Sequence, residues 1–139
     1  MRGIDVYLEA PSRTQELLNL KWTLKSAGFT IGSTWHENSG ITSALPLSEH
    51  WDARGVEQLR ACDLLVVICG KDSKAAPRMA MMAGLALARG LQVVWIGPSF
   101  EGLDAFRAVR KFNTAEDYEK VILRQMYSEP ASNRAQRAA

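Results

Sequence analysis

The sequence has few cysteines, no long apolar run and no large excess of charge. Its two cysteines, Cys62 and Cys69, form no CxxC pair, so we expect buried free thiols and no disulfide framework. No apolar stretch approaches the roughly 20 residues that a transmembrane helix needs. The 17 basic and 15 acidic residues leave a net charge of +2, and this balance does not indicate a nucleic-acid-binding surface.

The N-terminus also lacks the charged and apolar regions of a signal peptide, because a strand pattern begins at Ile4. We therefore expect a cytoplasmic protein with no membrane partner. A length of 139 residues with 47% hydrophobic composition suits one globular core. We predict a single domain over residues 1–128 and a disordered tail over 129–139, since the tail has no apolar pattern.

Strand-like and helix-like segments alternate along the chain. Strands are predicted at 4–9, 29–35, 64–69, 91–96 and 108–112, and helices at 12–28, 51–61, 78–89 and from 114 onward. The segment 64–69 is nearly all apolar, as a central parallel strand is. This alternation favours a three-layer α/β fold with a five-stranded parallel sheet and the flavodoxin-like order 2-1-3-4-5.

Capping signals mark several predicted helix ends. Ser12 and Gln15 have capping-box spacing, and Thr114 with Asp117 suits the start of the last helix. Pro77 suits the first turn of the helix over 78–89. Two apolar stripes are expected to face the core, namely Leu17, Leu18, Leu20, Trp22, Leu24 and Ala27 in the first helix and Tyr118, Val121, Ile122 and Met126 in the last.

In a sheet of this order, ligands collect beyond the carboxyl ends of the first and third strands. The helix that begins near Pro77 would point its amide-rich end toward this crevice and favour an anionic group, such as a nucleotide phosphate. The residues expected to line the crevice are Tyr7, Glu9, Ala10, Pro11, Gly70, Lys71, Asp72, Ser73, Arg78 and Gly97.

Three segments of the chain carry a resemblance to a known family: Tyr7 to Pro11, Gly55 to Val66 and Gly84 to Val93. Together they resemble the nucleoside 2-deoxyribosyltransferase-like superfamily, which includes the 2′-deoxynucleoside 5′-phosphate N-hydrolases. The resemblance spans about residues 3 to 125. Phe100 to Leu103 and Val109 to Phe112 are similar to small phage-type members, so a phage origin and a host cytoplasm are also expected.

The resemblance implies cleavage of an N-glycosidic bond by a glutamate that acts at the anomeric carbon of the sugar and is oriented by an early tyrosine. Tyr7 matches that tyrosine. The glutamate position falls at Met82, and other polar positions of the family fall at Gly55 and Ala76. A thioether cannot replace a carboxylate, and residues 78–89 contain no Asp or Glu. The resemblance therefore implies an inherited fold without its usual reaction.

Three functions remain as alternatives. The first is a catalytically degenerate protein that binds a nucleoside, a nucleotide or a related small molecule as a homodimer, with no cofactor or metal. The second is an active N-glycosidase or 2-deoxyribosyltransferase with a relocated carboxylate, supplied by Asp52 or Glu9. The third is a protein-interaction module, such as one that docks on a host protein through the methionine-rich helix over 78–89.

Ordinary structural roles compete with these assignments. Tyr7 is also typical of a core aromatic, and Met79, Met81 and Met82 are typical of core filler and interface surface. His36 and His50 lack a third ligand, so they do not indicate a metal site. The segment 70–74 lacks the order of a P-loop and is expected to form a solvated turn.

Overall fold

Five parallel strands form the centre of the molecule. The computed structural model describes residues 4–10, 14–33, 53–69, 76–98 and 108–128, with the backbone alone at 53–56, 76–78 and 127–128. The strands are β1 (Asp5–Glu9), β2 (Thr30–Ile31), β3 (Leu64–Ile68), β4 (Gln92–Ile96) and β5 (Val109–Phe112). Their order, β2-β1-β3-β4-β5, confirms the predicted flavodoxin-like sheet.

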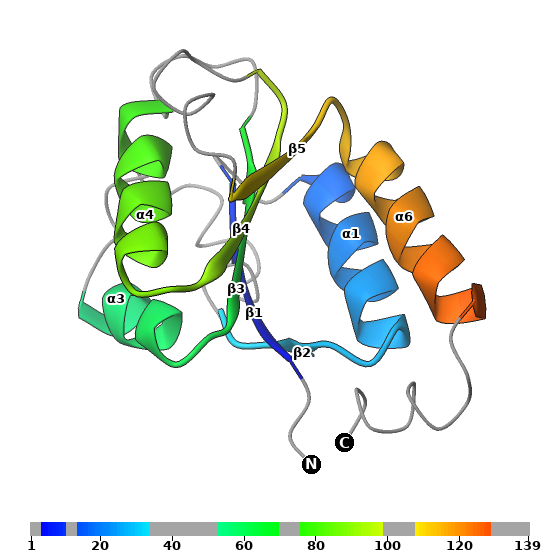
Figure 1. The fold of residues 1–139 in the computed structure, drawn as a ribbon, viewed down its shortest axis with the longest axis horizontal. Coiled ribbons are helices and arrows are strands. Elements are labelled where there is room, and N and C mark those ends of the chain that lie inside the picture. Colours follow the sequence, from blue (N-terminus) through cyan, green and yellow to red (C-terminus); the bar gives the residue numbers. More distant parts are fainter. Residues whose placement is uncertain (1–3, 11–13, 34–52, 70–75, 99–107, 129–139) are drawn as a thin grey trace.

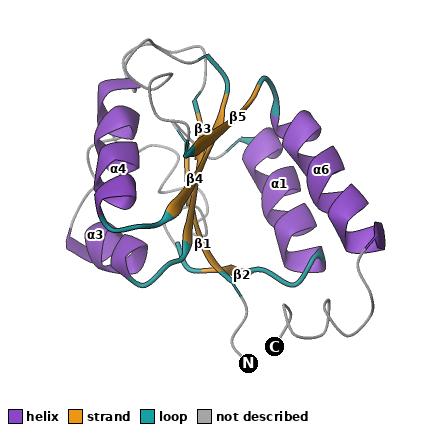
Figure 2. Ribbon diagram, in the orientation of Figure 1, coloured by secondary structure: helices purple, strands orange, loops and turns teal. Residues whose placement is uncertain are grey.

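Helices cover both faces of this sheet. They are α1 (Gln15–Ser26), α3 (Ala53–Arg60), α4 (Ala76–Ala88) and α6 (Ala115–Ser128). Figure 1 shows α1 and α6 side by side on one face, with α3 and α4 on the other, and Figure 2 shows the strands as the layer between them. Among the helices of the described ranges, none is long and apolar enough to cross a membrane.

The central strands are apolar because both of their faces are covered. Every residue of β3 is buried, and so are the last four residues of β1 and of β4. Because side chains alternate between the faces of a strand, residues in register share a face. Val6, Leu64 and Gln92 are in register on one face, and Tyr7, Leu65 and Val93 on the other.

The first helix differs from its prediction at its start and along its stripe. α1 begins at Gln15, and the hydroxyl of Thr14 accepts the N-cap hydrogen bond from the Leu17 amide at 3.2 Å, so the predicted start at Ser12 is wrong. Trp22 is 71% exposed, although Leu20 and Leu24 are buried. At 3.6 residues per turn, a position two residues from each of them points about 200° away, to the solvent side.

The last helix begins as predicted, and it packs on α1. Thr114 Oγ1 accepts a hydrogen bond from the Asp117 amide at 3.1 Å, which confirms the predicted cap. Tyr118 and Ile122 are buried, as their spacing predicts. The hydroxyl of Thr23 on α1 donates to Glu119 on α6 at 3.3 Å and joins the two helices.

Candidate functional site

The carboxyl edge of the sheet lies where the strand order predicts a ligand crevice. β1 pairs with β2 on one side and with β3 on the other, so the connections leave β1 and β3 in opposite directions. The described residues at this edge include Glu9 at the end of β1, Ala10 after it, Cys69 after β3 and Gly97 after β4. The described chain thus brings the predicted residues from β1 and β4 to one edge of the sheet.

Tyr7 and Glu9 face the layer that contains α3 and α4. Their register partners are Leu65 and Val67, whereas the neighbouring residue Leu64 lines a pocket together with α6. Alternation therefore turns Tyr7 and Glu9 away from α6. The side chain of Tyr7 is 1% exposed and that of Glu9 is fully buried, with Oε2 shielded from solvent. A glutamate side chain so deeply buried is rare in proteins unless it is paired or hydrogen-bonded.

The helix that carries Met82 packs its sheet-facing side with methionine and alanine. Met79, Met82, Ala83 and Ala86 are buried at the spacing of one helical face. Met82 is only 3% exposed, whereas Met81 is 66% exposed. The thioether of Met82 thus lies in the same layer of the fold as Tyr7 and Glu9. Position 82, where the resemblance implies a glutamate, therefore holds a methionine that packs in the core.

Gly97 has a structural reason to be glycine. Its φ of 112° is a conformation that side chains rarely adopt, and a Cβ there would overlap the carbonyl oxygen of Cys69. The Cys69 amide donates to Ile96 O at 2.7 Å, and the Gly97 amide donates to Phe112 O at 2.9 Å. Gly97 therefore allows the carboxyl ends of β3, β4 and β5 to lie close together, which is a role the crevice prediction did not include.

Sequence reasoning missed Ser33. The paired part of β2 is only Thr30–Ile31, much shorter than the predicted strand over 29–35, of which residues 34 and 35 lie outside the described residues. Beyond it, the Gly32 amide donates to Val6 O at 2.8 Å, and the buried Ser33 hydroxyl accepts from the Leu8 amide at 3.0 Å. Ser33 thus takes the place of a strand carbonyl at the edge of β1. The available signal was a serine two residues after the paired part of β2.

For several predicted site residues the structure describes only the position of the backbone. Gly55 lies in the first turn of α3, Ala76 is the first residue of α4, and Arg78 follows in the same turn. Because α4 follows β3, its amino end lies at the carboxyl edge, as predicted for an anion-binding helix start. The predictions for Pro11, Asp52, Gly70, Lys71, Asp72 and Ser73 lie outside the described residues.

The cysteines are free and buried, as expected. Burial raises the pKa of the Cys69 thiol, which disfavours the reactive thiolate at neutral pH. Among the described residues, no group of three His, Cys, Asp or Glu side chains is arranged to hold a metal ion. His36 and His50 lie outside those residues.

The strand order and the helices on both faces of the sheet define a protein of the flavodoxin-like α/β class. Such folds support many unrelated activities, so the class alone does not give a function. The sequence matches no model of a known protein family and no curated protein.

Proposed function

We propose that the protein binds a nucleoside or nucleotide at the carboxyl edge of the sheet and does not cleave it. The observation that carries this proposal is the burial of Met82 on the sheet-facing side of α4, in the layer that also contains Tyr7 and Glu9. The resemblance to the deoxyribosyltransferase-like superfamily supplies the ligand class. Without a carboxylate at position 82, no group there can attack or stabilise the anomeric carbon.

The local electrostatics favour a phosphate on such a ligand. The amino end of α4 lies at the carboxyl edge, and the partial positive charge of a helix start stabilises an anion beside it. Arg78 belongs to the first turn of this helix, and Lys71 and Lys74 precede it in the sequence. A deoxynucleoside monophosphate is therefore expected to bind more tightly than the corresponding nucleoside.

A thermal-shift series tests the binding. Deoxynucleoside monophosphates at millimolar concentration are expected to raise the melting temperature by several degrees, since a ligand at 100 times its dissociation constant stabilises by about 2.7 kcal/mol. Glu9→Gln is expected to reduce the shift, and Glu57→Gln, at a side chain that is 67% exposed on α3, should preserve it. If no deoxynucleoside or monophosphate stabilises the wild-type protein, the proposal is wrong.

A second candidate function is an active N-glycosidase or transferase that uses Glu9 in place of the missing glutamate. It is favoured by the complete burial of Glu9, on the same sheet face as Tyr7 and at the end of β1. A carboxylate in such a position can serve in acid, base or nucleophilic roles at a sugar. The two functions therefore differ in whether the bound ligand releases its base.

Chromatography of deoxynucleosides and their monophosphates after incubation with the protein separates these functions. We expect no released base from the wild-type protein, because no carboxylate occupies position 82. Base release that disappears in Glu9→Gln but persists in Glu57→Gln would establish the second candidate instead. Asp52→Ala extends the same comparison to the other predicted surrogate.

The methionine surface that α4 could offer to a homodimer is smaller than the sequence implies. Of the three methionines in this helix, Met79 and Met82 are buried and only Met81 is exposed. A docking surface on α4, for a second copy or for a host protein, would therefore be centred on Met81. The homodimer and the host partner both stay predictions.

A further inference from the structure

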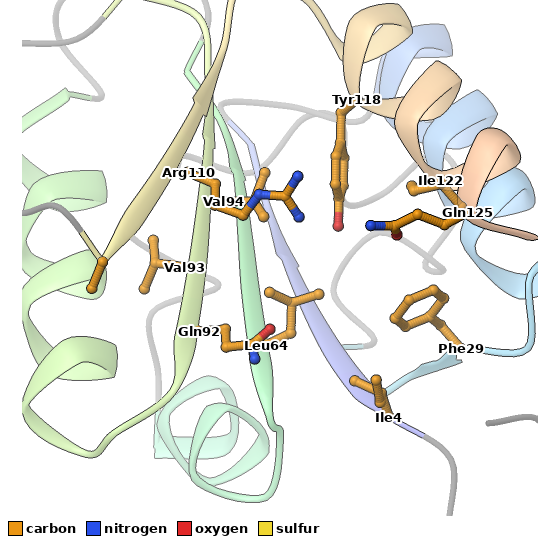
Figure 3. Close-up of a pocket in the computed structure, with 11 residues that line it drawn as sticks. Ile4, Phe29, Leu64, Gln92, Val93, Val94, Arg110, Tyr118, Ile122 and Gln125 are labelled. Atoms are coloured by element: carbon orange, nitrogen blue, oxygen red, sulfur yellow. The ribbon is translucent and has the colours of Figure 1, made fainter. Parts of the chain in front are cut away.

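A pocket of about 580 Å³ lies on the face of the sheet opposite to Met82. It is bounded by α6 and by the amino ends of the strands, since Leu64 and Gln92 are the first residues of β3 and β4. Ile4 and Phe29, which precede β1 and β2, also line it (Figure 3). This pocket is therefore separate from the carboxyl edge, and its volume is within the range typical of small-molecule sites.

Much of the pocket wall is apolar. Side chains of the strands, of α6 and of the residue before β2 contribute hydrocarbon or aromatic surface: Ile4, Phe29, Leu64, Val94 and Ile122. Tyr118 and Ile122 are four residues apart and so lie on the same side of α6. These side chains favour an apolar group on the ligand.

One end of the pocket carries a cation and a hydroxyl. Figure 3 shows the guanidinium of Arg110, on β5, extending toward the hydroxyl of Tyr118 on α6. The Tyr118 ring centroid lies 5.0 Å from that of Phe112, and Arg110 Cζ lies 5.5 Å from the Phe112 centroid. Arg110 is exposed, and these contacts place its guanidinium beside the aromatic rings of Phe112 and Tyr118. Among the described residues, no carboxylate forms an ion pair with Arg110.

The Tyr118 hydroxyl remains a hydrogen-bond donor over the physiological pH range. The side chain is 4% exposed, and burial raises its pKa to about 12, although the positive charge of Arg110 acts in the opposite direction. A neutral phenol and a guanidinium both donate hydrogen bonds, and the guanidinium also matches the planar geometry of a carboxylate. The polar end of the pocket is therefore suited to an anion that carries a single charge.

We propose that this pocket binds a small apolar monocarboxylate, with its carboxylate at Arg110 and Tyr118 and its hydrocarbon part against Phe29 and Ile122. A single guanidinium suits one carboxylate better than a doubly charged phosphate. The hydrocarbon part matches the apolar side of the pocket, and Gln92 and Gln125 also line it. This site is independent of the nucleotide site proposed at the carboxyl edge.

Isothermal titration of the full-length protein with octanoate and with 3-phenylpropionate tests the site. We expect saturable binding of both acids, and no comparable binding of octan-1-ol, which has the same chain without the charge. Arg110→Gln is expected to weaken octanoate binding about tenfold or more, and Tyr118→Phe about threefold, because each removes a hydrogen bond to the carboxylate. Tyr118→Phe keeps the ring that packs on Phe112.

Two further variants control for charge and folding. Arg124→Gln removes an exposed arginine of α6 that does not line the pocket, so it should leave octanoate binding unchanged. Arg110→Lys keeps the charge without the planar fork and should bind with intermediate affinity. The proposal is overturned if octanoate does not bind the wild-type protein, if Arg110→Gln binds it equally well, or if octan-1-ol binds as tightly as octanoate.

Discussion

Gly97→Ala is expected to lower the free energy of unfolding by about 3–5 kcal/mol, because it combines backbone strain with overpacking. The φ of 112° is unfavourable for alanine, and the added methyl would overlap the carbonyl oxygen of Cys69. That carbonyl belongs to backbone, so it can move away only if the ends of β3 and β4 separate. Urea unfolding with linear extrapolation measures the change.

Two other glycines provide matched controls for Gly97→Ala. Gly90 has a φ of 80° but open space around its added methyl, so Gly90→Ala should cost only the strain, about 1–2 kcal/mol. Gly84 lies inside α4, also with open space, and Gly84→Ala should stabilise by about 1 kcal/mol through helix propensity. Equal costs for Gly97→Ala and Gly90→Ala would show that the Cys69 overlap is unimportant.

The arrangement of strands was predictable from the sequence, because buried strands are made of hydrophobic residues. β3 and β4 are apolar runs of the expected length, and their positions between helices require right-handed parallel connections. The cap at Thr114 was also predictable, since it depends only on residues within four positions of it. Local chemistry and burial are the properties that a single sequence expresses most clearly.

Features that depend on distant contacts were not predictable in this way. The Ser33 hydroxyl, beyond β2, accepts a hydrogen bond from the Leu8 amide, 25 residues away. The Arg110 and Tyr118 end of the second pocket likewise joins β5 to α6 across the sheet edge. No periodicity within one element encodes such pairs. The start of α1 was missed for another reason, since Thr14 and Ser12 have equally suitable capping chemistry and only Thr14 is used.

The candidate site was predictable as a place and only partly as a set of side chains. Strand order predicts a crevice at the carboxyl edge, and alternation along β1 puts Tyr7 and Glu9 on one face. The complete burial of Glu9 was not predictable, because glutamate is usually exposed. Gly97 was predicted as a ligand contact, but its conformation gives it a separate role in packing β4 against β3.

Met82→Glu, which introduces the residue type implied by the resemblance, is expected to destabilise the protein by about 3–5 kcal/mol at pH 8, because it buries a charge without a partner of opposite charge. Met82 is 3% exposed within a layer of apolar side chains. The free energy of unfolding is measured in urea at pH 8 and at pH 4.5. The value at pH 8 gives the loss of stability, and the difference between the two pH values shows whether the buried charge causes it.

The pH dependence identifies the buried carboxylate as the cause. Burial raises the pKa of a carboxyl group above the value of about 4.3 that it has in the unfolded chain. The folded variant then prefers the protonated form, so its stability relative to the wild type is greatest at low pH and is lost as the pH rises through the raised pKa. Met82→Gln has similar size without the charge, so its deficit should not change between the two pH values.

Met81→Glu is the matched control, since the adjacent side chain on the same helix is 66% exposed. It should change the stability by no more than about 0.5 kcal/mol, as surface substitutions usually do. If Met82→Glu is equally mild, position 82 faces water and not the core. Base release from deoxynucleosides by Met82→Glu combined with Gly55→Asp would then show that the residues at these two positions account for the lack of cleavage. A large, pH-dependent cost with no base release instead means that core packing at position 82 excludes a carboxylate.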